Sequence, residues 1–193
     1  MSVNLNHQAA TIVDAPTDLD YHVDGQSVLT GTINQASSLT LWVNGQSFVK
    51  IDGSVPLLRI RLVDGQSKVR LEGLKAGEVT MLEKLDGQSI LSVSTTGNFS
   101  FADKIDGNSW LLVDKVAPAV AGGLGAFRGK IDGKSRVDIT VDNPNANYHV
   151  EFFDKIDGAS TVELWNTWFT TTGRELSGSS TVSYTEASLP PHF

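Results

Sequence analysis

Aspartate and serine recur three residues apart along this 193-residue chain, with a glycine directly after the aspartate. The stretch Ile156–Leu164 gives the nine-place unit: apolar, Asp or Asn, Gly, any, Ser, any, apolar, any, apolar. A single Asp-Gly-x-Ser string would suggest a nucleophile beside a base. The unit recurs, however, starting at Val23, Val43, Val63, Leu85, Ile105, Ile131, Ile156 and Leu176. Because these equivalent serines cannot all be nucleophiles, the repetition favours an architectural role and a protein that is not an enzyme.

The repeated carboxylates are the second feature with chemical potential. If successive units stack, the second-place residues form a row with neighbours about 5 Å apart, and such carboxylates repel unless compensated. Calcium between them is one compensation, with candidates at Asp64, Asp86, Asp106, Asp132 and Asp157. We prefer two others: an Asx turn, in which each Asp accepts an N–H of its own corner, and a neighbouring lysine row. The sequence therefore predicts no resident metal and no cofactor.

Composition narrows the choice of partners and compartment. The net charge of -7 argues against a nucleic-acid partner, because phosphate binding favours a basic face. The absence of cysteine excludes disulfides and thiolate metal sites. No apolar run has the length of a membrane span, and the first residues do not resemble a signal peptide. A cytoplasmic and a cell-surface location both stay open.

The spacing of the units predicts the elements that carry these residues. Successive units start 20 to 26 residues apart, and a period near 20 with short strands indicates stacked β-coils. Places one, seven and nine are apolar and place eight is mostly polar, the alternation of a strand with one buried face. The Asp-Gly step suits a turn. We therefore expect an all-β, single-domain, right-handed parallel β-solenoid of about eight coils.

The repeat also divides the chain. Residues 1–20 lie outside it and are expected to form an N-terminal cap over the first coil. Residues 21–185 form the solenoid, in which the stretches 114–130 and 140–155 are longer than the other return halves. Because their coils are consecutive, these two loops should be neighbours. Residues 186–193 are expected to be an irregular C-terminal tail.

Two groups of residues are candidates for contact with a ligand or partner. Outward-pointing apolar residues of neighbouring units would form an exposed patch, which is typical of a contact surface; they are Phe48, Ile90, Trp110 and Leu112. The longer loops would carry a second site made by Phe127, Arg128, Asn147, Tyr148 and His149. A loop that covers the apolar patch is the alternative to the first interpretation.

The unit Ile156–Leu164 resembles the repeats of the GIN-type adhesin domains of bacteria, which carry similar Gly-x-Ser-x-Val-x-Leu strings. The resemblance spans about residues 23–184, is confined to the motif, and implies a β-solenoid without catalytic residues. The Asp before each Gly is more regular here than in that family. The chain is also similar, more loosely, to the bactofilin class of polymer-forming solenoids, whose coils are shorter.

These observations lead to three functional hypotheses. The first is a non-enzymatic structural protein for adhesion or self-assembly, whose partner is another copy or another protein. The second is a carbohydrate-binding, or less readily carbohydrate-cleaving, β-helix that uses the loops 114–130 and 140–155; cleavage would require two carboxylates at a glycosidase separation. The third is a solenoid stabilised by calcium along the aspartate row.

Overall fold

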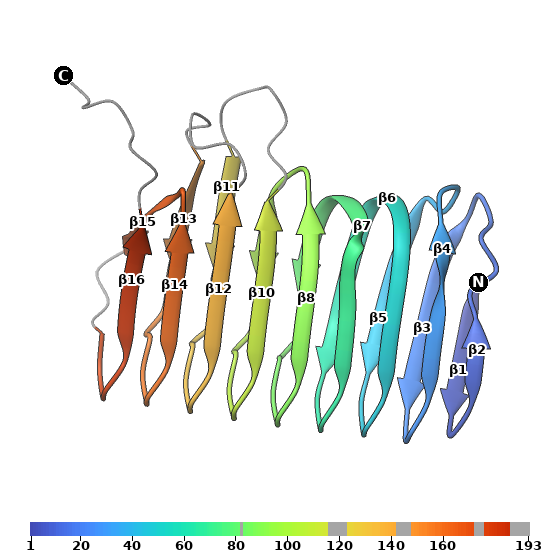
Figure 1. The fold of residues 1–193 in the computed structure, drawn as a ribbon, viewed down its shortest axis with the longest axis horizontal. Coiled ribbons are helices and arrows are strands. Elements are labelled where there is room, and N and C mark those ends of the chain that lie inside the picture. Colours follow the sequence, from blue (N-terminus) through green and yellow to red (C-terminus); the bar gives the residue numbers. More distant parts are fainter. Residues whose placement is uncertain (82, 116–122, 142–147, 172–175, 186–193) are drawn as a thin grey trace.

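The structure is a computed structural model that describes residues 1–81, 83–115, 123–141, 148–171 and 176–185. Strands lie side by side along a rod, with the N-terminus at one end and β16 at the other (Figure 1). All strand pairs along the rod are parallel, and the coils repeat about every 20 residues. The fold is the predicted all-β parallel β-solenoid.

Each coil contributes one strand to each of two rows. The unit row follows the Asp-Gly corners and comprises β2 (Ala9–Thr11), β4 (Val28–Ile33), the first part of β6 (Phe48–Val63), the first part of β7 (Lys68–Met81), β8 (Ile90–Thr95), β10 (Trp110–Lys115), β12 (Arg136–Val141), β14 (Thr161–Trp165) and β16 (Thr181–Thr185). The return row comprises β1 (Ser2–Asn6), β3 (Asp18–Asp24), β5 (Ser38–Val43), the last parts of β6 and β7, β9 (Phe99–Phe101), β11 (Gly123–Phe127), β13 (Tyr148–Phe152) and β15 (Trp168–Thr171). Strands β6 and β7 run through both rows.

The register follows the predicted unit. Place six of one coil pairs with place six of the next, as in Trp110 with Arg136 and Arg136 with Thr161. Residues at places one, seven and nine are buried between the two rows, with Val69, Leu71 and Leu85 fully enclosed. The alternation in the sequence therefore identified the core face of the unit strands, because successive strand residues point to opposite faces.

The N-terminal segment is a coil of the solenoid and not a separate cap, which corrects the expectation for residues 1–20. Strand β1 pairs with β3, placing Leu5 beside Val23, and β2 pairs with β4, placing Ala9 beside Val28. His7 stands at the corner with a φ of 54°, where the later copies have glycine. The nine-place pattern does not identify this copy, because the copy lacks the glycine and is one residue shorter.

The Asp-Gly corners are held by hydrogen bonds between successive coils. The N–H of Gln66, at place four, donates to the carbonyl of Gly45 in the preceding coil at 2.7 Å, and Gln88 bonds to Gly65 in the same way. Gly65 has a φ of 75°, and a Cβ there would overlap the Gly45 carbonyl oxygen. Glycine is therefore required for two reasons, its left-handed backbone and the close approach of the next coil.

Replacing Gly65 by alanine should destabilise the protein by about 2–4 kcal/mol, because it adds left-handed strain and disrupts an inter-coil hydrogen bond. The measurement is urea unfolding followed by circular dichroism. Gln66→Ala is the matched control, since its exposed side chain can be removed at a cost of about 0.5 kcal/mol or less. Equal stability of the two variants would contradict the role of this corner.

Aromatic side chains fill the core where the coils are longest. The Phe127 ring stacks between Phe101 and Phe152, with centroid separations of 5.0 and 5.1 Å. Phe127 is only 1% exposed. A Cβ on Gly125 would overlap the Phe99 ring, so this glycine makes room for the cluster. The proposal of Phe127 as a ligand contact is thus wrong, because the side chain at this place of β11 points into the core.

Phe127→Ala should cost about 3–5 kcal/mol of unfolding free energy, as expected for removal of a buried aromatic ring. Chemical denaturation would measure this loss. Phe48→Ala provides the comparison, since Phe48 is only partly buried on the outer face. Retention of wild-type stability by Phe127→Ala would place its ring outside the core.

Candidate functional site

The aspartate row at the corners is a ladder of turns and ion pairs. In the seven units with Asp or Asn at the second place, this side chain accepts the N–H of the following glycine, at 2.6 Å for Asp86 with Gly87 and 2.7 Å for Asp157 with Gly158. Asn44 does the same with Gly45 at 2.7 Å. An amide thus serves as well as a carboxylate, which supports the prediction of a structural turn.

Lysines supply the second compensation that the sequence predicted. Lys84 lies 2.8 Å from Asp86 and 3.4 Å from Asp64, so one ammonium bridges two coils. Lys130 likewise bridges Asp132 at 2.7 Å and Asp157 at 3.2 Å. Each cation lies between carboxylates of successive coils, where a calcium ion would have to bind. Across the described part of the chain, no cluster of three or more His, Asp or Glu side chains is suited to hold a metal.

The corner contacts lower the pKa of the carboxylates. The hydrogen bond from Lys84 holds the pKa of Asp86 below its ordinary value, and Lys104 does the same for Asp106. The N–H of Gly158, together with Lys130, lowers the pKa of Asp157 to about 2. These groups therefore stay ionised over the usual range of pH, which suits a structural ladder and not a general acid.

The place-five serines are buried, except for the partly buried Ser180 of the last unit. Ser27, Ser109 and Ser135 are at most 1% exposed. Their hydroxyls donate to a carbonyl three residues back in the same corner, at 2.6 to 2.7 Å. Buried hydroxyls bound to backbone carbonyls lack the adjacent base that a nucleophile needs.

The outward apolar candidates lie on the unit face, defined here as the outward side chains at places six and eight of the unit row. Trp110 is 36% exposed and pairs with Ile90 of the neighbouring strand. Its Nε1 donates to Asp138 at 2.8 Å, and the Arg136 guanidinium lies 5.3 Å from its ring centroid. Leu112 is half-buried next to it. Phe48 is partly buried on β6, separated from Ile90 by Lys68.

The loop candidates are only partly described. Strands β11 and β13 pair, so the two long return halves are neighbours, as predicted. Arg128 is exposed and lies 5.0 Å from the Phe153 ring centroid. Tyr148 and His149 begin β13, and only their backbone positions are described. Asn147 lies outside the described residues, as do residues 116–122 and 142–146 of the two loops.

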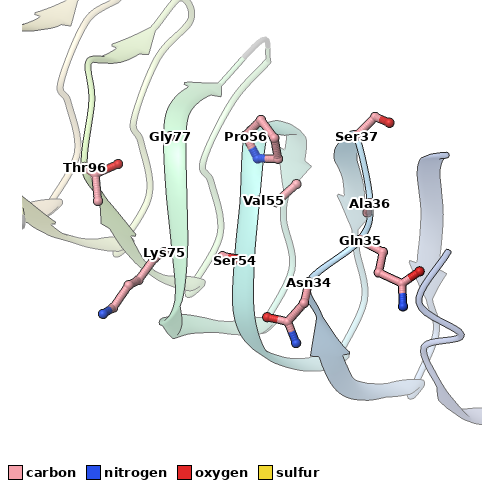
Figure 2. Close-up of a pocket in the computed structure, with 10 residues that line it drawn as sticks. All are labelled: Asn34, Gln35, Ala36, Ser37, Ser54, Val55, Pro56, Lys75, Gly77 and Thr96. Carbon is pink, nitrogen blue, oxygen red and sulfur yellow. The ribbon is translucent and has the colours of Figure 1, made fainter. Parts of the chain in front are cut away.

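Several grooves lie on the surface of the described residues, and one of about 450 Å³ runs beside Phe48 and Lys68. A larger one, about 660 Å³, crosses the return corners of four coils near Asn34, Ser54, Lys75 and Thr96. Figure 2 shows its side chains splayed outward instead of converging on one point. No carboxylate lines it, so it lacks the groups for glycoside cleavage.

A smaller groove, about 380 Å³, lies near the N-terminal end and contains a cluster that the sequence prediction missed. The His22 ring stacks on Trp42 with a centroid separation of 5.2 Å. Arg61 lies 5.0 Å from the Trp42 centroid. The spacing of 20 residues between His22 and Trp42 signals the stacking, whereas a bulge in β6 displaces Arg61 from the repeat.

No family model, curated protein or solved structure matches this chain. The assignment as a β-solenoid therefore depends on its own strand pairing. Within the described ranges, no helix has the length and hydropathy of a membrane crossing.

Asp157→Asn should remove part of the acid sensitivity of the fold. The pKa of Asp157 falls from an ordinary 3.8 to about 2 on folding, so its stabilisation is present above pH 3.8 and is lost as the pH falls toward 2. Asn can still accept the Gly158 N–H, as Asn44 does in its corner, but it does not titrate. Melting temperatures between about pH 5 and pH 2 should converge for the two proteins at low pH. Parallel curves would contradict this assignment.

Proposed function

We propose that this chain is a non-enzymatic structural protein that self-associates by stacking its coils end to end. The observation that supports this proposal is the matching pair of strand edges at the two ends of the described rod. Strands β1 and β2 pair only on their inner side, and so do β15 and β16. Such edges favour the addition of further strands.

The polarity of the coil makes the two ends complementary. At place six, the N–H points back to the carbonyl of the residue before place six in the preceding coil, as in Phe48 to Ser27 and Thr181 to Ser160, both at 2.9 Å. Ala9 holds this place in β2, so its N–H points out of the N-terminal end. The Ser180 carbonyl is the equivalent acceptor at the other end. A second copy would therefore continue the ladder in the same direction.

The order of the strands at the two ends also allows a second copy to extend both rows. The described rod begins with the return strand β1 and finishes with the unit strand β16. The β1 strand of a second copy would pair with β15, and its β2 strand with β16, so both rows would continue without a missing strand. Heterologous contacts of this kind do not close, which leads to linear assemblies. A rod or short filament of this type is suited to a scaffolding or adhesive role.

Ala9→Pro should suppress end-to-end assembly, because proline removes the outward N–H and blocks an edge without breaking a bond to β4. Ala9→Val keeps this N–H and is the matched control. Light scattering after size exclusion, with electron microscopy, should find oligomers that grow with concentration for the wild type and the valine variant only. A wild-type protein that stays monomeric at high concentration would contradict end-to-end assembly.

A further inference from the structure

The place-eight row of the unit face has charges arranged antisymmetrically about its centre. Neighbouring strands align these residues in one row along the rod. In order they are Thr30, Lys50, Arg70, Ser92, Leu112, Asp138, Glu163 and Ser183. Two cations thus lie on one side of the centre, two anions on the other, and Ser92 and Leu112 between them.

The basic half of the row is uncompensated within the chain. Lys50 and Arg70 are exposed and directly adjacent on neighbouring strands. Like charges in this arrangement repel. Neither side chain has an ion pair within 4 Å among the described residues. At the other end, Asp138 and Glu163 share the guanidinium of Arg136, at 2.9 and 3.2 Å, so the anions exceed the cations there.

We propose that the unit face binds the unit face of a second copy, with the two rods antiparallel and a two-fold axis parallel to the strands between β8 and β10. This rotation reverses the order of the coils along the rod. Each place of the nine-place unit then faces the same place in a unit of the second copy. Lys50 then lies across from Glu163 of the second copy, and Arg70 across from Asp138. The interface is isologous, so each of these contacts occurs twice.

The centre of this interface is apolar. Ile90 faces Trp110 of the second copy, and Leu112 lies beside it, whereas Ser92 is only 4% exposed and adds little contact area. The Trp110 ring is already held by Asp138 and Arg136, so little side-chain freedom is lost on binding. Lys68 lies across from Arg136, and this contact between like charges opposes the pairing, but the two acids beside Arg136 leave that end with a net negative charge. The apolar candidates identified from the sequence thus acquire a partner of defined chemistry.

The charge pattern selects the antiparallel arrangement. A two-fold axis along the rod would place Lys50 on Lys50 and Arg70 on Arg70, which is repulsive. The six coils give a contact of roughly 29 Å by 16 Å from the strand spacings, or about 460 Å² on each partner. This area is below the ~800 Å² of a standard interface. The pairing should therefore be concentration-dependent and weakened by salt.

Charge-reversed variants test this pairing, which deepens the self-association proposed above but uses a different surface. Lys50→Glu with Arg70→Glu makes the row acidic, and Asp138→Asn with Glu163→Lys makes it basic. The asparagine retains an acceptor for Trp110 Nε1. Each variant by itself should dimerise at least tenfold more weakly than the wild type in analytical ultracentrifugation at low salt. An equimolar mixture should recover dimers, because three of the four contacts between the two variants become attractive and the fourth, between Glu at position 70 and Asn at position 138, is neutral.

All proteins in this test carry Ala9→Pro, so that end-to-end contacts do not contribute, and circular dichroism checks that each one folds. If Asp138→Asn impairs folding, Glu163→Lys by itself replaces the basic variant. A monomeric Ala9→Pro protein, or a mixture no more dimeric than its components, would overturn the face-to-face pairing. The end-to-end proposal is judged separately, from the difference between Ala9→Pro and Ala9→Val in otherwise wild-type chains.

Discussion

The hydrogen bond from the fourth place of one corner to the glycine carbonyl of the preceding corner is the constraint on which the structure depends. It requires a residue without a Cβ, a left-handed backbone and a constant coil spacing, as in Gly65 on Gly45. Once the corners are fixed, the strands on both sides lie in register, and their apolar places meet in one core. The conserved spacing of places within the unit is thus a consequence of corner stacking.

The charged side chains at the corners have compensating partners close by, whereas some of those on the flat unit face do not. At the corners, every carboxylate has a local N–H, and lysines such as Lys84 bridge successive coils. Contacts within the chain thus compensate the charges of this row. On the unit face, Lys50 and Arg70 have no ion pair among the described residues, and Asp138 and Glu163 lie farther along the same row. This difference is why the face, and not the aspartate ladder, is the surface from which we infer association.

We propose two modes of self-association, one at the ends and one on the side of the rod, with different physical requirements. End-to-end stacking depends on backbone hydrogen bonds and on the order of the strands, so it tolerates changes in side chains. Face-to-face pairing depends on the charges at place eight and on the Ile90–Trp110 centre, so it is sensitive to salt and substitution. A rod that uses both would form paired filaments.

The sequence by itself determined the all-β class, the coil period, the inward apolar places and the structural role of the Asp-Gly corners, because a strict local repeat allows one regular stacking. It did not reveal the degenerate first coil, since His7 replaces the expected glycine and one residue is missing. It also gave the wrong orientation for Phe127. The alternation of inward and outward side chains cannot be followed from the corner through a long return half. Only the tertiary structure decided these points. It also showed that Asp138 and Glu163 share Arg136 whereas Lys50 and Arg70 are exposed without an ion pair among the described residues, since such contacts depend on where the side chains lie.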